Sequence, residues 1–430
     1  MTATTIVGVR ARRVYDSRGR PTVEAEVALQ GDASGRAIAP AGASRGSREA
    51  VDLRDGGAAL GGLDVVGAVA NVRAALANAI IGLDARDQAA VDAALIAADG
   101  TPNKSRLGGN AIVAVSLAVA NAAANAEGVP LWRYLAAGGL VTLPLPEIQI
   151  FGGGAHASRR LDLQDVMVMP IGATTFADAL AMVAEIYRAA GAWMVERGRG
   201  AGVADEGGWW PEFDRNEQAL LGLVAAIERA GYEPGRDAAI SLDIAASELM
   251  HDGHYRLALD GRELDRDALA ALWLDWLDRY PIASIEDPFA EDDGEGWRAF
   301  ARAAGSRVQI VGDDYLTTSA ARVEAAARDD ACNAVLLKPN QAGTLTETRA
   351  ALEAARVAGF AAIVSARSGE TEDVAVAHLA VGWSAGQLKV GSFARGERTA
   401  KWNEVLRIEE ALGADARFVG ASALAGSRPR

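Results

Sequence analysis

The sequence has almost no cysteine, with Cys332 the single one in 430 residues. One cysteine excludes an internal disulfide framework and suits a reducing cytosol. Cys332 begins an apolar run, so we predict that it is a small buried hydrophobic residue. The opening MTATTIVGVRARR lacks the uninterrupted apolar core of a signal peptide. We therefore expect a cytoplasmic protein.

Basic residues and long apolar runs are also scarce. Lysine and arginine total 43 against 57 aspartates and glutamates, a formal net charge of -14. Such a charge argues against a nucleic-acid partner and against an anionic membrane surface. The least charged stretch, AIVAVSLAVANAAANA from Ala111, is too short and too rich in alanine and asparagine to favour a bilayer span. We predict a closely packed buried helix there and no membrane partner.

Apolar residues make up 50% of the sequence, which is enough for a large hydrophobic core. The length of the chain suits a barrel with a smaller companion domain. Residues 5–39 alternate apolar and polar side chains, which predicts a small antiparallel sheet, and helical patterns follow from Val65 to Leu135. Glycines and prolines between 138 and 146 then mark a boundary. We expect an α+β cap over 1–137 and a barrel over 144–420.

In the second part, six charged residues each close a short apolar run and precede a helical pattern. They are Asp243, Glu286, Asp313, Lys338, Arg367 and Lys389. This pattern is typical of parallel βα units, whose barrel places catalytic groups at the carboxyl ends of the strands. Two close strands, at 147–151 and 165–169, and two helical patterns come first, which makes the barrel irregular. The segment 202–211 is predicted to be a loop, not a ninth strand.

Three of these residues, Asp243, Glu286 and Asp313, are candidate metal ligands. Any one alone would more simply be a helix N-cap or part of a surface ion pair. Three carboxylates at equivalent strand ends favour a metal instead, and hard oxygen ligands suit Mg²⁺. Lys338 and Lys389 would face this metal, and neighbouring cations can lower a lysine pKa toward that of a general base. Spacing does not decide which lysine accepts a proton, and a structural salt bridge is the alternative for each.

Other candidates lie in glycine-rich segments. Glu206, in DEGG, is a possible general acid, although a solvated turn is the usual explanation for such a segment. His156 lies in the loop after the first barrel strand. Arg367, Ser368 and Gly369 follow a strand and are predicted to precede a helix, where amides and a guanidinium would bind an anion such as phosphate. Together these groups predict proton abstraction next to a carboxylate.

Seven segments resemble motifs of the enolase family, in order and nearly end to end. They are DSRGRPTVE (16–24), GTPNKSRLGGNAI (100–112), DEGG (205–208), SIEDP (284–288), LLKPNQAGTLTET (336–348), RSGETED (367–373) and KWNEVLRIEEAL (401–412). The order and number of matches make the resemblance very specific. A lysine base with magnesium is itself the arrangement known from enolase-superfamily sites, so the chemistry above matches a known pattern.

The resemblance implies an N-terminal α+β cap on a β-β-α-α-(βα)6 barrel, assembled as a dimer or a larger ring of dimers. It implies that Asp243, Glu286 and Asp313 hold a tightly bound Mg²⁺. The substrate would be a small phospho- or phosphono-carboxylate.

It also implies roles around the substrate. Lys338 would be the base, Glu206 the acid toward the leaving hydroxyl, and Lys389 would bind the substrate carboxylate. Asp165 would lie beside the leaving group. The residues implied in substrate binding, with those of the adjoining loops, are His156, Gln164, Arg367, Ser368, Lys389, Ser44, Arg45, Arg159 and Arg160. Of these, Arg367 and Ser368 would hold the phosphate.

The chain departs from the family motifs at several of these positions. SHRSGE reads SARSGE, so Ala366 replaces a histidine, and PSGAST reads PAGASR, so Ala41 replaces a mobile-loop serine. The Glu of the QEF motif is Asp165, Phe-Ala after DEGG becomes 209–210 Trp-Trp, and the Asn of NGG becomes Gly152. Losing a group that acts in a transition state typically costs a few kcal/mol. Three such changes would cripple ordinary turnover unless they compensate one another.

Cations have been gained in loops that close over the substrate in enolases. Arg45 stands where enolases carry threonine, and Arg159-Arg160 replace a polar pair. Drift toward surface arginine is one explanation for each. An additional anionic group in the ligand is the other, and we favour it because Ala366 enlarges the space nearby.

Three hypotheses follow. The favoured one is a divergent magnesium-dependent enzyme that deprotonates 2-phosphoglycerate or a close analogue, resembling the carboxyphosphonoenolpyruvate synthases of phosphonate pathways by analogy. The second is an ordinary enolase that converts 2-phosphoglycerate to phosphoenolpyruvate and water. The third is a catalytically silent enolase fold retained for binding. The intact lysines, Glu206 and metal carboxylates argue against the third.

Overall fold

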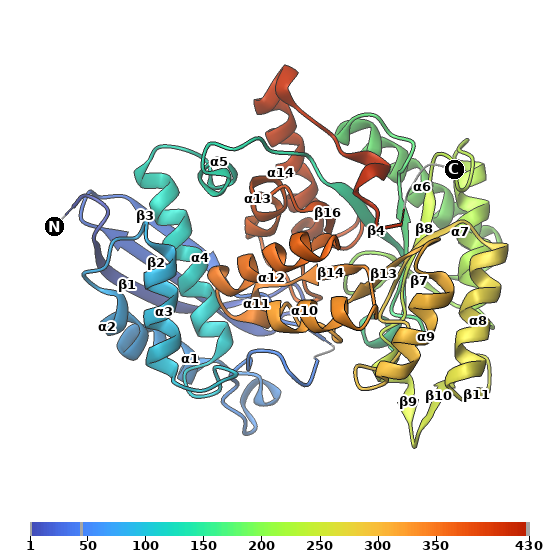
Figure 1. The fold of residues 1–430 in the computed structure, drawn as a ribbon, viewed down its shortest axis with the longest axis horizontal. Helices are drawn as coiled ribbons and strands as arrows, with labels where there is room; N and C mark the ends of the chain where they lie inside the picture. The colour runs from blue at the N-terminus through green and yellow to red at the C-terminus, as the bar shows by residue number, and fades with distance from the viewer. Residues whose placement is uncertain (1, 44–45, 427–430) are drawn as a thin grey trace.

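A small sheet and a layer of helices form the N-terminal part of the protein, beside a larger barrel (Figure 1). The computed structural model describes residues 2–43 and 46–426. The sheet contains β1 (Ile6–Tyr15), β2 (Pro21–Leu29) and β3 (Ser34–Ile38), antiparallel and in the order β1-β2-β3. The predicted antiparallel sheet over 5–39 is confirmed.

The cap helices pack on this sheet and on one another, and the last one, α5, also contacts α13 (Ala375–Gly382) of the barrel. They are α1 (Val66–Asn71), α2 (Ala77–Ile80), α3 (Gln88–Asp99), α4 (Gly109–Ala126) and α5 (Leu131–Ala136), with a π-helical turn at Val72–Leu76 and a 3₁₀ turn at Ala59–Gly62. Helix α4 packs on β2 and β3, and Gly35 permits the close approach, since a Cβ there would lie 2.1 Å from the Ala122 amide nitrogen. Helix α4 is long and apolar enough to cross a membrane, but 83% of it is buried inside the protein. The predicted buried helix is confirmed.

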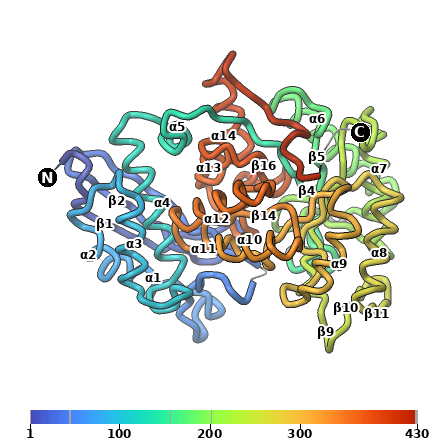
Figure 2. The backbone as a smooth tube through the Cα atoms, viewed as in Figure 1, coloured from blue at the N-terminus to red at the C-terminus, as the bar shows by residue number. Residues whose placement is uncertain are grey.

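Eight strands close the barrel (Figure 2). They are β4 (Leu145–Gly152), β5 (Asp165–Met169), β8 (Ala239–Asp243), β12 (Ile282–Glu286), β13 (Gln309–Gly312), β14 (Ala334–Leu337), β15 (Ala361–Ser365) and β16 (Gly386–Lys389). Pairing of β16 with β4 completes the ring, and β5 runs antiparallel to both of its neighbours. The predicted irregular barrel with an α+β cap is therefore confirmed.

Helices surround the barrel and connect its strands. They are α6 (Phe176–Glu196), α7 (Glu217–Arg229), α8 (Arg266–Arg279), α9 (Gly294–Ala304), α10 (Ala320–Arg328), α11 (Pro339–Ala342), α12 (Leu345–Ala358), α13 (Ala375–Gly382) and α14 (Gly396–Leu412). Short 3₁₀ turns occur at Gly154–Ala157, Ala246–Leu249, Gly413–Asp415 and Gly420–Ala423. A small hairpin sheet, β9 (Met250–His251), β10 (His254–Leu257) and β11 (Arg262–Leu264), extends from the loop after β8.

Strand register brings the predicted residues to one level of the barrel. Glu286 pairs with Asp243, and Asp165 pairs with Asp243 from the other side. Lys389 ends β16, while Asp313 and Lys338 directly follow β13 and β14. The carboxyl ends of neighbouring parallel strands meet at one edge, and the antiparallel β5 begins at the same edge with Asp165, so backbone pairing brings these side chains to one level.

Two local predictions were wrong. The segment predicted as a loop at 202–211 contains a hairpin, β6 (Gly200–Val203) and β7 (Trp209–Pro211), that extends the sheet beyond β4. Gly207 and Gly208 in DEGG signalled a turn, and this signal hid the two short strands that the turn joins. Arg367 does not immediately precede a helix, because α13 begins only at Ala375.

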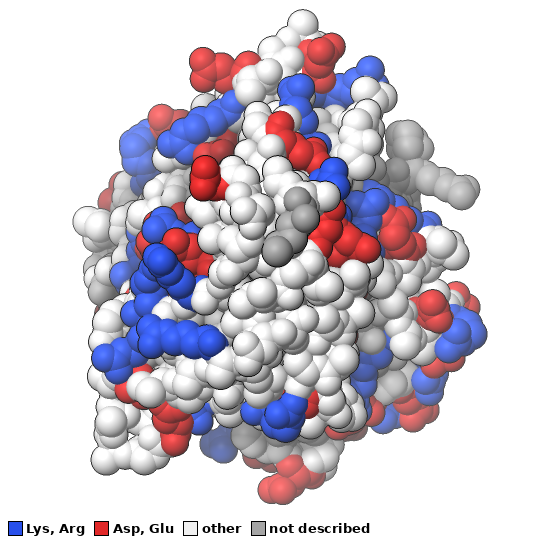
Figure 3. Space-filling model, turned by 90° about the vertical axis from the view of Figure 1, so that its left-hand side faces the viewer, with Lys and Arg blue, Asp and Glu red and all other residues white. Residues whose placement is uncertain are grey.

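The cap face mixes charges of both signs. Lysine, arginine and acidic side chains lie in small groups around a broad area of uncharged residues (Figure 3).

The single cysteine lies in the core. Cys332 is 6% exposed, two residues before β14, and burial raises the pKa of its thiol. Its predicted burial is confirmed.

Candidate active site

One small cavity at the mouth of the barrel brings seven of the predicted residues together. It has a volume of about 20 Å³, roughly the room of one water. The lining residues are Gln164, Asp165, Glu206, Lys338, Ser365, Ala366, Arg367, Ser368 and Lys389. Larger hollows lie elsewhere, such as one of about 290 Å³ beside Lys104. Chemistry, not volume, therefore identifies this cavity, and Ala366 leaves no large empty space in it.

Carboxylates from neighbouring strands surround the ammonium group of Lys389. Lys389 Nζ lies 2.8 Å from Asp243 Oδ2 and 2.8 Å from Glu286 Oε2, with Asp165 Oδ2 at 3.4 Å. Gln164 also donates to Asp243 Oδ2, at 3.0 Å. All of these groups are buried. The ammonium compensates part of a dense negative charge inside the barrel.

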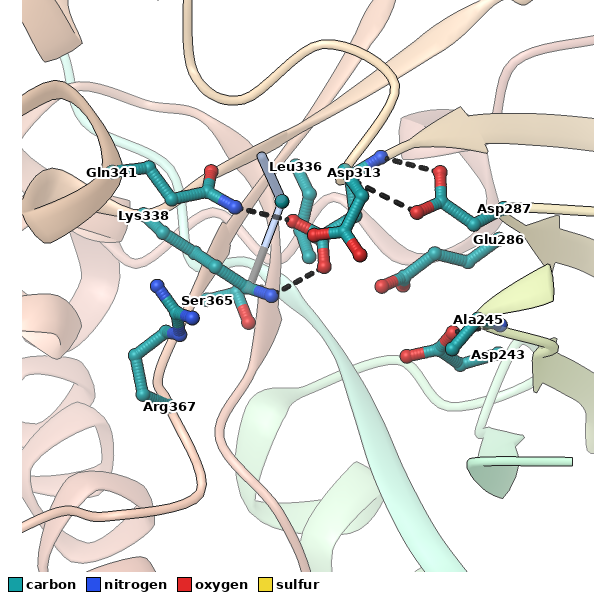
Figure 4. Close-up of polar contacts among 12 residues, drawn as sticks. Asp243, Ala245, Glu286, Asp287, Asp313, Leu336, Lys338, Gln341, Ser365 and Arg367 are labelled. Carbon is teal, nitrogen blue, oxygen red and sulfur yellow. Dashed lines mark hydrogen bonds and ion pairs between the residues drawn. The ribbon is translucent and has the colours of Figure 1, made fainter. Parts of the chain in front are cut away.

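The third predicted carboxylate, Asp313, is held from the other side of the mouth. Figure 4 shows Lys338 and Gln341 reaching Asp313, with Glu286 and Asp243 opposite. Lys338 Nζ forms an ion pair with Asp313 Oδ2, and Gln341 donates to Asp313 Oδ1 at 2.9 Å. The amide of Lys338 donates to Thr318, whose hydroxyl donates in turn to Gln341. The candidate base Lys338 and the carboxylate of Asp313 thus belong to one hydrogen-bonded network.

Burial and charge shift the titration of these groups in both directions. Burial, together with the Asp243 charge, holds the pKa of Glu286 well above its usual value. Burial also raises the pKa of Asp313, but Lys338 outweighs it and the net pKa is lowered. For Lys338, burial lowers the pKa, but the negative charge of Asp313 raises it by more than burial lowers it. The net pKa of Lys338 is therefore raised. The expectation that neighbouring cations lower this lysine's pKa does not hold here, because a carboxylate is closer.

The acidic residues satisfy the chemical requirements of a divalent cation site. Glu286 Oε1 is buried and has no hydrogen-bond partner among the described residues. An unpartnered oxygen in a cluster of excess negative charge is suited to a hard cation. Within the part of the chain that the structure describes, however, the three carboxylates whose oxygens lie within 4.8 Å of one another are Asp287, Asp313 and Asp314. Asp287 already accepts the amides of Asp313 and Asp314, so it fixes the loop after β13.

Asp165, the shortened carboxylate, is held by a neighbour that sequence reasoning missed. Gln149 Nε2 donates to Asp165 Oδ1, and Gln149 Oε1 accepts the amide of Gly208 at 2.8 Å. Gly208 ends the DEGG turn that carries Glu206, which is buried and lines the cavity. One glutamine therefore ties the strand-end carboxylate to the turn of the candidate acid.

Arg367 and Ser368 contact the cap. Arg367 Nη1 lies 2.9 Å from Glu49 Oε2 and donates to Asn340 Oδ1 at 3.2 Å. Ser368 Oγ accepts the amide of Ala43 at 2.8 Å. Ala41 and Gly369 exchange two backbone hydrogen bonds, of 2.9 and 2.8 Å, and this docking does not use the side chain of residue 41.

The loop candidates lie farther from the cavity. Arg159 and Arg160 form ion pairs with Glu248 and Glu212, and neither arginine lines the cavity. These pairings do not support the expectation that the new arginines face a second anionic group. His156 belongs to the 3₁₀ turn at Gly154–Ala157, and its side chain is outside the description. Ser44 and Arg45 lie outside the described residues.

Four buried groups around the site were not predicted from the sequence. They are Glu49, Glu147, Gln149 and Gln341. Glu147 pairs in register with Lys389, and burial raises its pKa to about 7. A signal existed for Glu147 and Gln149, since both interrupt an apolar strand pattern at alternate positions. Glu49 and Gln341 offered no such signal, because their partners are far away in the chain.

Comparison with known proteins agrees with this geometry. A family model described as the enolase N-terminal domain matches residues 6–135, and one described as the enolase C-terminal TIM barrel domain matches 140–426. Enolase 1 of Desulfitobacterium hafniense (strain Y51) is 49% identical over 416 residues, covering 96% of this chain and 95% of that protein. With fold, strand-end residues and both domain matches in agreement, the chain belongs to the enolase family, and it is an enzyme of the lyase class.

Proposed function

We propose that the protein is a magnesium-dependent enolase that dehydrates 2-phosphoglycerate to phosphoenolpyruvate. The observation that carries the proposal is the shared cavity, where Lys338, Glu206 and Lys389 meet beside the acidic cluster. The 49% identity to a protein named Enolase 1 favours this reaction over a derived one.

The proton steps follow from the side chains that line the cavity. Lys338 Nζ would remove the proton from C2, next to the substrate carboxylate, whose charge Lys389 would bind. The electron pair left on C2 then forms the C2–C3 double bond as the C3–O bond breaks. Protonated Glu206 would give its proton to the departing hydroxyl, which leaves as water. Asp165, held by Gln149, would lie beside this leaving group.

For Lys338 to accept a proton it must first be neutral. The ion pair with Asp313 favours the charged form in the present arrangement. Asp243, Glu286 and Asp313 would hold Mg²⁺, and bound Mg²⁺ supplies positive charge that balances the carboxylates and the extra negative charge of the deprotonated substrate. A cation held there would offset the Asp313 charge that raises the pKa of Lys338, which would favour the neutral lysine.

Phosphate binding would require an exchange of partners. Arg367 and Ser368 are the proposed phosphate ligands, with His156 and Gln164 lining the pocket. Glu49 now neutralises Arg367, and the amide of Ala43 occupies the Ser368 hydroxyl oxygen. A phosphate would compete with Glu49 for the guanidinium, so its binding would break the ion pair between Arg367 and Glu49.

A direct assay tests the proposal. Purified protein with Mg²⁺ and 2-phosphoglycerate should form phosphoenolpyruvate, and the Lys338→Ala variant should lose about 10²–10⁴-fold in rate. Removal of Mg²⁺ with a chelator should abolish the reaction, and its return should restore it. Absence of turnover in the folded wild-type protein would overturn the dehydration.

A second candidate is a derived enzyme that deprotonates the same substrate but forms a different enolpyruvyl product, as in phosphonate metabolism. The substitutions at Ala366, Ala41 and Asp165 favour it. It predicts little phosphoenolpyruvate from 2-phosphoglycerate alone, but magnesium-dependent exchange of the C2 proton with solvent. A folded protein that shows neither reaction would be a binding protein, the third and weakest reading.

Assembly and location are also proposals. We infer a cytoplasmic homodimer or larger assembly, with the division into a cap over 1–137 and a barrel over 144–420. Strand β1 is an edge strand of the cap sheet and exposes Val7 and Tyr15, which are 42% and 53% exposed. Exposed apolar edge strands are usually covered by another chain or element. Light scattering of the purified protein measures the mass directly, and a monomer would contradict the dimer.

A further inference from the structure

Trp209 and Trp210 follow the DEGG turn, and their side chains contact different neighbours on either side of strand β7. Trp209 stacks on Tyr187 of α6, with ring centroids 4.8 Å apart, and its Nε1 donates to the Tyr187 carbonyl at 2.8 Å. Gly191 of α6 leaves room for this ring, since a Cβ there would lie 2.4 Å from Trp209. Tyr187 also donates its hydroxyl to the Gly207 carbonyl at 2.9 Å. The turn that carries Glu206 is therefore fixed to the barrel wall.

Trp210 points the other way and contacts the segment Gly153–Gln164. Its Nε1 donates to the carbonyl of Ala157 at 2.7 Å, directly after His156 in the chain. The guanidinium of Arg160 lies over the Trp210 ring, 4.4 Å from its centroid. Arg160 also donates to Glu212 Oε1 at 2.6 Å. Trp210 and Glu212 are two residues apart in extended chain, so they present neighbouring groups to the same segment.

The far end of this segment has a separate anchor. Asp162 and Asn216 exchange two hydrogen bonds, at 2.9 and 2.7 Å. Asp162 further accepts the amides of Ala258 and Leu259, both at 3.0 Å. With that end fixed, the contacts of Trp210 and Arg160 act on the middle of the segment, around residues 157–160.

We propose that Trp210 is a positioning residue, which together with Arg160 and Glu212 clamps the middle of Gly153–Gln164 to the hairpin that carries Glu206. The two loops on either side of the cavity then behave as one unit. Its catalytic consequence rests on the proposed function, because only a substrate of this cavity would sense the clamp. Both Trp210 and Arg160 are positions where the chain departs from the motifs that it resembles.

The clamp should act on substrate binding more than on the chemical step. Releasing the segment lowers the fraction of molecules in which the loop is already in place, and apparent affinity falls by that fraction. Bound substrate would restore the loop, so the rate at saturation changes little. We expect KM for 2-phosphoglycerate to rise roughly tenfold in Arg160→Met and Trp210→Phe, with kcat within about twofold of wild type.

The experiment has two independent readouts and a matched control. Hydrogen exchange of the amides at 155–160, measured without substrate, should speed up roughly tenfold in both variants. Arg197→Met removes a similar contact elsewhere, since Arg197 lies 4.3 Å from the Trp193 ring centroid on α6. It should change neither exchange at 155–160 nor KM. Arg160 is a partly exposed residue, so its variant tests the clamp even if Trp210→Phe folds poorly.

The outcomes separate this proposal from the proposed function. Unchanged exchange at 155–160 in Arg160→Met, or an equal change in Arg197→Met, would overturn the clamp whatever the enzyme's reaction is. Faster exchange confined to the clamp variants supports it, even if 2-phosphoglycerate proves not to be the substrate. A loss in kcat with KM unchanged would overturn the positioning role.

Discussion

The floor and the roof of the active site are held in place in different ways. On the floor, Asp243, Glu286 and Lys389 end strands whose backbone ladders fix their positions. Over the floor lie cap residues 38–43 and 46–50 and the segment 153–164, which are tied down by individual side chains such as Glu49 and Arg160. The floor retains the family's lysines and metal carboxylates but also carries the departures at Asp165 and Ala366, and the roof holds others, such as Ala41 and Arg160. A backbone ladder tolerates substitution of side chains, whereas a roof built from single contacts can be altered one residue at a time.

The largest effect should come from breaking the floor. Glu286→Gln removes a charge from the proposed cation site but keeps the size of the side chain. We expect at least about a hundredfold loss of turnover, because charge stabilisation at the metal is weakened.

The stability of the protein gives a second readout of the same cation site. Wild-type protein at 100 times the Kd for Mg²⁺ should gain about 2.7 kcal/mol in free energy of unfolding. Thermal unfolding with and without Mg²⁺ measures this, and a variant that keeps the full gain would contradict the role of Glu286.

The next effect should come from the buried roof contact. Glu49→Gln removes the charged carboxylate that lies 2.9 Å from the buried Arg367 guanidinium. Removing one partner of a buried ion pair costs about 3 kcal/mol. Urea unfolding of the variant should show this loss in the free energy of unfolding. A loss below about 1 kcal/mol would mean that Asn340 and neighbouring groups suffice to hold Arg367.

A gain is expected where residues around the cavity depart from the family. Ala366→His together with Ala41→Ser should raise phosphoenolpyruvate formation by roughly tenfold, the rate equivalent of about 1.4 kcal/mol. Steady-state turnover of 2-phosphoglycerate by the double variant and by each single variant provides the measurement. If none of them gains activity, these positions do not limit the dehydration.

The smallest effect should come from an exposed roof contact. Glu248→Gln breaks the ion pair with Arg159, whose side chain is 59% exposed. Exposed pairs contribute about 0–1 kcal/mol, so the free energy of unfolding should change by less than about 0.5 kcal/mol. Urea unfolding beside Glu49→Gln makes this the matched surface control. Equal losses in the two variants would remove the distinction between buried and exposed contacts.

The sequence predicted the floor of the site well and the roof poorly. An apolar run that ends in a charge is a local signal, and βα topology then places all such ends together, so Asp243, Asp313 and Lys338 could be located in advance. Glu49 and Arg367 are 318 residues apart, and no local pattern connects them. The raised pKa of Lys338 depends on its distance from Asp313, which spacing along the chain does not give. The hairpin around DEGG was missed because its strands are only a few residues long.

The burial of Cys332 has a practical consequence. It is the one thiol in the chain, it lies two residues before β14, and Lys338 directly follows that strand. A buried thiol with a raised pKa reacts with a labelling reagent when the surrounding structure opens. The rate of labelling of the native protein would therefore report how often the strand supporting the candidate base detaches, without any mutation or attached probe. The thiol therefore reports on local unfolding at the far end of the strand that leads to the candidate base.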